Sequence, residues 1–112
     1  MAITSSFIET TGTDLVTIPS GENWAITTLI ICNTFAVDPT DDQAGLASFD
    51  IHLLQDGASA TDTNRVINGL QLQAGETFTF DSEKIVLESG DKIDIIGESP
   101  TVLSATVSWM TV

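Results

Sequence analysis

Few side chains in this chain are of the types that carry covalent chemistry. The 112 residues include one cysteine, Cys32, one histidine, His52, and no tyrosine. A catalytic pair of cysteine and histidine also needs a group that orients the histidine, and the sequence shows no such group. Patterns that bind nucleotides or metal ions, such as a P-loop, HExxH or CxxC, are absent from the sequence. The sequence therefore predicts that the protein is not an enzyme and needs no cofactor.

The contexts of these two residues suggest structural roles. Cys32 lies in the apolar run LIICN, where a small buried hydrophobic residue is expected. Around His52, the apolar residues Phe49, Ile51 and Leu53 alternate with polar ones, so His52 is predicted to point away from the core. We interpret His52 as a surface or subunit-interface histidine.

One acidic segment offers the oxygen ligands that calcium prefers. Asp38, Asp41 and Asp42 lie close together in the sequence. Calcium takes six to eight oxygens, usually from a glycine-punctuated loop in which acidic or amide residues alternate. The order Asp-Pro-Thr-Asp-Asp-Gln lacks that alternation. A solvated acidic loop is therefore the favoured interpretation, and a calcium loop is the alternative.

The net charge excludes two classes of partner. Sixteen acidic and three basic residues give a formal net charge of -13. So few cations cannot displace the counterions of nucleic acid, and the carboxylates would repel an anionic membrane surface. The charge favours either solubility of a protein displayed at high density or attraction to a basic partner, and both interpretations stay open.

Length and composition indicate one folded domain over residues 1–112. At this size a chain builds a single hydrophobic core, and 42% hydrophobic residues are enough to order it. A lone cysteine cannot form an internal disulfide. The start MAITSSFIETT has no basic leader pattern, and no run reaches about 18 apolar residues. We expect a soluble protein made in the cytoplasm, with residues 1–13 as an N-terminal strand or arm that contributes to subunit contacts.

The residue pattern predicts an all-β fold. Sixteen threonines and ten serines are interleaved with Ile, Val, Leu and Phe, as on half-buried strands. We expect an antiparallel β-sandwich or jelly roll with about eight strands and little or no helix. The candidate strands span residues 3–8, 14–18, 24–34, 47–55, 69–72, 76–80, 84–88, 92–96 and 101–112.

Three segments repeat one turn pattern, in which a small residue, a glycine and an acid precede alternating apolar residues. They begin at Ser20, Ala74 and Ser89. The glycine is expected to adopt a positive φ, and each turn is predicted to close a hairpin. Two longer loops, residues 35–46 and 56–68, are where contacts with partners or ions are expected.

Most of the chain resembles the small virion proteins of tailed bacteriophages. The resemblance rests on LVTIPSGENWAI at residues 15–26, IICNT at 30–34 and FDIHLL at 49–54. It continues through NRVI at 64–67, LQLQAGET at 70–77, IVLESGDKI at 85–93 and a closing strand at 102–109. The acid-rich insert at 35–46 and the high acidity depart from the family pattern. The resemblance implies a compact β-sandwich with a structural, non-enzymatic role in a phage particle.

The role expected from this resemblance is that of a capsid decoration or cement protein. It would be a trimer that binds the major capsid protein, stabilises the head shell and resides in the virion after assembly in the host cytoplasm. The alternatives are a tail, neck or fibre component and, from another class, a calcium-dependent carbohydrate-binding module. Apolar side chains at both chain ends and in the first long loop are expected to be covered by neighbouring subunits. The candidate interface residues are Ile3, Phe7, Ile8, Phe35, His52, Met110 and Val112.

Overall fold

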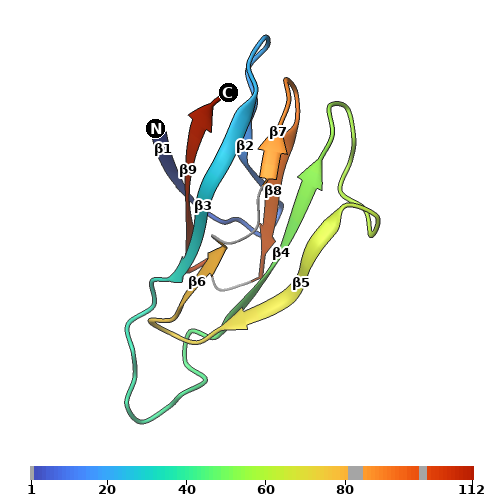
Figure 1. Ribbon diagram of the computed structural model, residues 1–112. Coiled ribbons are helices and arrows are strands. Elements are labelled where there is room, and N and C mark those ends of the chain that lie inside the picture. The colour runs from blue at the N-terminus through green and yellow to red at the C-terminus, as the bar shows by residue number, and fades with distance from the viewer. Residues whose placement is uncertain (1, 81–84, 99–100) are drawn as a thin grey trace.

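The computed structural model describes residues 2–80, 85–98 and 101–112 and confirms the all-β prediction. The described residues form nine strands and no helix, in two antiparallel sheets packed face to face (Figure 1). The strands are β1 (Ala2–Phe7), β2 (Thr13–Thr17), β3 (Trp24–Asn33), β4 (Ala47–Leu54), β5 (Arg65–Leu72), β6 (Thr77–Phe80), β7 (Ile85–Leu87), β8 (Lys92–Gly97) and β9 (Leu103–Thr111).

The sheets differ in size and in how their edges are built. The five-stranded sheet has the order β1-β9-β3-β6, and β7 also pairs with β3. The four-stranded sheet has the order β2-β8-β4-β5. Only β4 and β5 follow each other in sequence and also pair. Most connections therefore cross from one sheet to the other.

The expected strand boundaries agree with the structure to within two residues except at β5. This strand begins at Arg65, four residues before the expected Gly69. Its first half pairs with β4 through two register shifts, so its side chains do not keep a regular alternation of apolar and polar residues. Lys84, the expected first residue of the seventh strand, lies outside the described residues.

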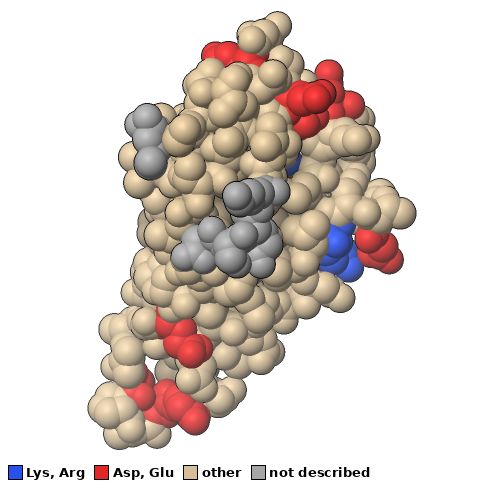
Figure 2. Space-filling view, viewed as in Figure 1, with Lys and Arg blue, Asp and Glu red and all other residues tan. Residues whose placement is uncertain are grey.

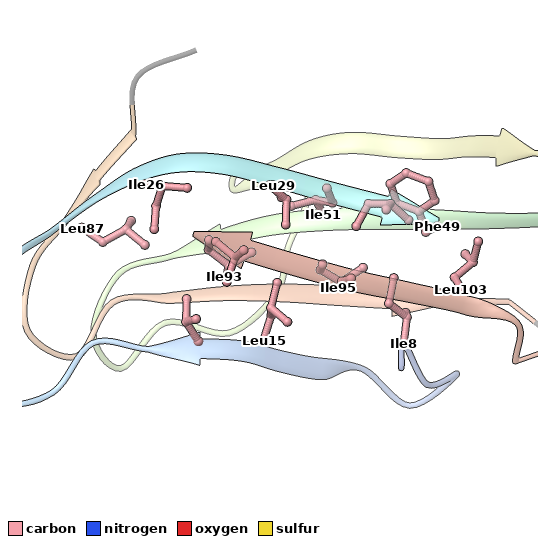
Figure 3. Close-up of a cluster of buried hydrophobic side chains, with 14 of the residues drawn as sticks. Ile8, Leu15, Ile26, Leu29, Phe49, Ile51, Leu87, Ile93, Ile95 and Leu103 are labelled. Carbon is pink, nitrogen blue, oxygen red and sulfur yellow. The ribbon is translucent and has the colours of Figure 1, made fainter. Parts of the chain in front are cut away.

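The core lies between the two sheets and draws side chains from both. Leu29 on β3 and Val107 on β9 face Ile51 on β4 and Ile95 on β8, and all four are buried. Figure 3 shows buried side chains from both layers pointing into this shared space. Burying one such side chain stabilises a fold by about 1.5–3 kcal/mol. This shared core holds the two sheets together.

The three repeated glycine turns are not hairpins, which corrects the sequence prediction. They connect β2 to β3, β5 to β6 and β7 to β8, and each of these pairs of strands lies in different sheets. The expected positive φ is confirmed, at 82° for Gly21, 79° for Gly75 and 85° for Gly90. In the first of them the N–H of Glu22 donates to the carbonyl of Pro19 at 3.2 Å, and the other two turns close with the same spacing. A four-residue turn with glycine third is a type II turn, which splays the flanking strands, whereas tight hairpins favour type I′ or II′ turns.

Two of these turns lie side by side at one end of the sandwich, near both termini (Figure 1). The hydroxyl of Ser89 accepts a hydrogen bond from the N–H of Gly21 at 2.8 Å. The N–H of Gly90 donates to the carbonyl of Ile18 at 2.9 Å. These contacts tie the β2–β3 and β7–β8 connections to each other.

The opposite end is organised by the buried side chain of Asn33. Its Nδ2 donates to the carbonyls of Gly45 at 2.7 Å and Leu72 at 3.0 Å. Its Oδ1 accepts from the N–H of Phe35 at 3.0 Å. The backbone carbonyl of Asn33 also accepts from the N–H of Gly75 at 3.1 Å. The Asn33 side chain therefore joins the acid-rich loop (residues 35–46) to the end of β5. The Asn33 backbone binds the turn that follows β5.

Candidate functional site

A row of ionisable side chains crosses the four-stranded sheet, with one from each strand. Asp14 on β2 lies opposite Asp94 on β8, Asp94 lies opposite His52 on β4, and His52 lies opposite Arg65 on β5. Residues that face each other across antiparallel strands point to the same side of the sheet. The buried Ile51 next to His52 belongs to the core, so this row lies on the outer face.

Hydrogen bonds and ion pairs link the members of the row to each other and to their neighbours. The Nε–H of Arg65 donates to Nε2 of His52 at 3.3 Å. The guanidinium of Arg65 also lies 3.7 Å from the carboxylate of Asp50 and 3.1 Å from that of Asp62. At the other end of the row, Lys92 Nζ lies 3.6 Å from the Asp14 carboxylate. The two basic side chains among the described residues, Arg65 and Lys92, therefore form their ion pairs at the two ends of this row.

Two members of the row are buried although the row lies on the outer face. His52 is only 1% exposed, and its Nδ1 has no hydrogen-bond partner among the described residues. Asp94 is also buried, and Gly12 packs close to its carboxylate. Burial raises the pKa of Asp94 above 3.8, and the hydrogen bond and negative charge of Asp14 raise it further, while His52 and Lys92 act in the opposite direction.

No member of the row lines the hollow beside the β4–β5 loop. Among the residues that line this hollow are Gln55, Ala58 and Asn64. Cys32 does not join the row, because it lies on β3 in the other sheet. It is half-buried rather than fully buried as expected, opposite Ser104 and Thr77 on its neighbouring strands. The structure thus keeps the one cysteine and the one histidine in different layers.

The three aspartates of the acid-rich loop (residues 35–46) accept hydrogen bonds from within the loop. Oδ1 of Asp38 accepts from the N–H of Thr40 at 2.9 Å and from its hydroxyl at 2.7 Å, and these hydrogen bonds lower the pKa of Asp38. Oδ1 of Asp41 accepts from the N–H of Gln43 at 3.0 Å, and Asp42 accepts from the Gln43 side chain. Among the residues that the structure describes, no group of three or more His, Cys, Asp or Glu side chains is placed to hold a metal ion. These carboxylates stabilise the turns of the loop.

Five of the seven candidate interface residues are exposed: Ile3, Phe7, Phe35, Met110 and Val112. Ile8 and His52 are buried, which corrects the prediction for both. The chain turns inward after β1, so the N–H of Ile8 donates to the carbonyl of Leu103 at 2.8 Å and its side chain joins the core. His52 points to the face that was predicted, but its neighbours on the sheet leave it no accessible surface.

The sheets differ sharply in charge. The five strands β1, β3, β6, β7 and β9 contain no Asp, Glu, Lys, Arg or His. Each strand of the four-stranded sheet contains at least one. In the view of Figure 2, the acidic side chains of the described residues gather towards the ends of the molecule and along the side that carries the cation, and the described surface between them carries neither acidic nor basic side chains.

The outer side of the five-stranded sheet is consequently an uncharged face, and we use that name for it below. Ser and Thr side chains hydrogen-bond across it, as between Ser5 and Thr106 at 2.8 Å. Apolar side chains lie at its margins: Ile3 and Phe7 on β1, Met110 on β9 and Val86 on β7. The sequence analysis missed this face because the charges separate only when strands are assigned to sheets. Counting charges strand by strand would have indicated it.

The described part of the chain contains no helix of the length and apolarity needed to cross a membrane. Comparison of the chain with protein-family models, with curated proteins and with solved structures found no match.

Proposed function

We propose that this protein is a non-enzymatic structural component of a phage particle that binds neighbouring subunits through the uncharged face. The observation that carries the proposal is the segregation of charge between the sheets. Charged residues are depleted from the centres of protein interfaces, because burying a carboxylate without a partner is costly. In a chain of net charge -13, a sheet whose five strands contain no acidic or basic residue offers a surface that can be buried without that cost.

The dimensions of the uncharged face suit a protein interface. Strands rise about 3.4 Å per residue and lie about 4.8 Å apart. With a ten-residue central strand, a sheet four strands wide covers roughly 600 Å² on this spacing. Stable interfaces bury roughly 600–1,000 Å² per partner. The uncharged face and its margins are therefore large enough to seat the protein on another subunit.

Within a phage particle, the role that we favour is decoration of the head shell. Binding of this protein at junctions between major capsid subunits would bury protein surface that is exposed in the undecorated shell. Binding of this kind stabilises the assembled state by mass action. The acidic ends would remain in solvent and keep densely displayed copies soluble. The resemblance of residues 14–109 to small phage virion proteins supports this assignment.

Electron microscopy of phage particles with and without the protein tests the role. Density repeated with icosahedral symmetry on the head is the expected result. A few copies at one vertex or along the tail would instead support the alternative of a tail, neck or fibre component. Particles that never contain the protein would overturn the proposal.

A matched pair of charge variants tests the surface. Thr79→Glu places a carboxylate on the uncharged face, and Gln71→Glu places the same charge on an exposed position of the four-stranded sheet. Occupancy on the particle should fall at least tenfold for Thr79→Glu and stay unchanged for Gln71→Glu. Equal occupancy of the two variants would show that the uncharged face is not the binding surface.

A further inference from the structure

The four sheet edges differ in how they are protected against pairing with another chain. An edge strand exposes unpaired N–H and C=O groups, and charges, bulges or short strands keep other strands away. The β2 edge carries Asp14 and a register shift. The β5 edge carries Arg65 and two register shifts. The edge beyond β3 is divided between β6, of four residues, and β7, of three.

The β1 edge has none of these protections. Ala2–Phe7 pairs with β9 over six consecutive positions without a register shift, and the segment AITSSF contains no charged residue, proline or glycine. No other described strand pairs with its outer side. Ile3 is 69% exposed and Phe7 is 57% exposed, both on the uncharged face. This edge is open to strand addition.

We propose that β1 pairs with β1 of a second copy of this chain, antiparallel, about a twofold axis that passes through Ser5. This register places Ile3 opposite Phe7 of the second copy, and by symmetry the pair occurs twice. A pairing of aromatic and β-branched side chains across antiparallel strands is stabilising. A shift by two residues would place Ile3 opposite Ser5 and lose both pairs. The distribution of apolar residues along β1 therefore selects a single register.

The charge distribution favours a second copy over a basic partner. A basic chain would be drawn to the carboxylates at the two ends of the sandwich, whereas β1 offers it no charge to bind. Two copies joined at β1 bring their uncharged faces side by side in one extended sheet. The pairing is closed by its twofold symmetry. It gives a dimer in place of the trimer expected from the sequence, and it does not depend on the proposed function.

Analytical ultracentrifugation of the purified chain over a range of salt concentrations tests the dimer. Each copy carries a net charge of -13, so the dimer fraction should rise as salt shortens the Debye length from about 8 Å at 0.15 M to about 3 Å at 1 M. Ile3→Lys and Phe7→Lys should each raise the dissociation constant at least tenfold. Val86→Lys is the matched control, because Val86 is 63% exposed on the same face but at the opposite edge.

Two outcomes of this experiment would overturn the proposal. One is a wild-type chain that remains monomeric at 1 M salt and at the highest concentration that it tolerates. The other is a Val86→Lys variant that dissociates the dimer as strongly as Ile3→Lys, because that result would move the interface away from β1. Circular dichroism of each variant shows whether the sandwich has folded.

Disulfide trapping tests the register by a separate route, in a Cys32→Ser background. In the proposed pairing the two Ser5 Cα atoms lie about 4.5–5.5 Å apart, within the range that a disulfide bridges. The two Ile3 positions are separated by four residues along the strands, or about 14 Å. Ser5→Cys should give a covalent dimer under mild oxidation, and Ile3→Cys should not. Equal trapping at both positions would contradict the register.

Discussion

Asp14 on β2 and Asp94 on β8 lie directly opposite each other on the outer face of the four-stranded sheet. Burial raises the pKa of Asp94, and the hydrogen bond to Asp14 and its charge raise it further. The folded state consequently holds a proton on Asp94 at a pH where the unfolded chain has released it. The contribution of Asp94 to the stability of the fold is therefore lost as pH rises from about 3.8, the ordinary pKa of an aspartate, through the higher pKa of the folded state.

Asp94→Asn removes this pH-dependent contribution and keeps a side chain that donates to Asp14. We expect the variant to be more stable than the wild type at pH 7 by roughly 1 kcal/mol, the scale of a buried hydrogen bond. The difference should shrink as pH falls and vanish below about 3.8. Urea denaturation at a series of pH values measures it. A variant that is less stable than the wild type at pH 7 would contradict the raised pKa.

The contact between Arg65 and His52 predicts the tautomer of the buried histidine. Arg65 Nε always carries its hydrogen, so Nε2 of His52 accepts and the ring hydrogen lies on Nδ1. Nitrogen-15 NMR of the histidine ring distinguishes the two tautomers. A hydrogen found on Nε2 would show that this hydrogen bond does not form.

Arg65→Met should destabilise the fold by about 1–3 kcal/mol, because it leaves the buried Nε2 of His52 without a donor. The methionine retains an apolar stem, so the loss reports the polar contacts of the guanidinium with His52, Asp50 and Asp62. Asp62→Asn is the control, since it removes only an exposed ion pair with Arg65. Such pairs contribute about 0–1 kcal/mol. If the two variants lose the same stability in urea denaturation, the buried hydrogen bond contributes nothing measurable.

The hydrogen bonds of the buried Asn33 side chain predict a large loss of stability when this side chain is removed. Asn33→Ala leaves the carbonyls of Gly45 and Leu72 and the N–H of Phe35 without their partner. Each buried group left unsatisfied costs about 1–3 kcal/mol, and water that enters the vacated space compensates part of the cost. We expect a loss of about 2–4 kcal/mol in urea denaturation. Asn68→Ala, at an exposed position of β5, should change stability by less than about 0.5 kcal/mol.

Strand positions could be predicted from the sequence because alternation of apolar and polar residues is a local signal. Phe49 and Ile51 on β4 are core residues as expected. The partner of each strand is not a local property. The turns at Gly21, Gly75 and Gly90 have the φ that the pattern demands, yet the pattern alone does not separate the type II turns that cross between sheets here from the type I′ and II′ turns of hairpins.

The candidate site could not be predicted for the same reason, because the sequence does not show which strands pair. Alternation gave the correct side of the sheet for His52, but its partners across the neighbouring strands, Asp94 and Arg65, lie 42 and 13 positions away in the sequence. The uncharged face likewise assembles strands from both ends of the chain. Its residues are ordinary Ser, Thr and apolar types, and only the strand order brings together five strands that contain no acidic or basic residue.

Two of the turn glycines offer a comparison between backbone strain alone and strain combined with a steric clash. An alanine Cβ at Gly21 would meet no atom within 4 Å. Gly21→Ala should therefore cost only the left-handed conformation, about 1–2 kcal/mol. At Gly90, the added Cβ would collide with the side chain of Asp56.

The clash at Gly90 also affects hydrogen bonds that hold the turn. The neighbouring Asp91 carboxylate accepts from the N–H of Asp56 at 3.1 Å, and the N–H of Gly90 donates to Ile18. Moving Asp56 away would disturb these contacts, so Gly90→Ala should cost at least about 1 kcal/mol more than Gly21→Ala. Urea denaturation of both variants measures the difference. Equal losses would mean that the Asp56 side chain moves away freely, because the backbone conformation is the same in both turns.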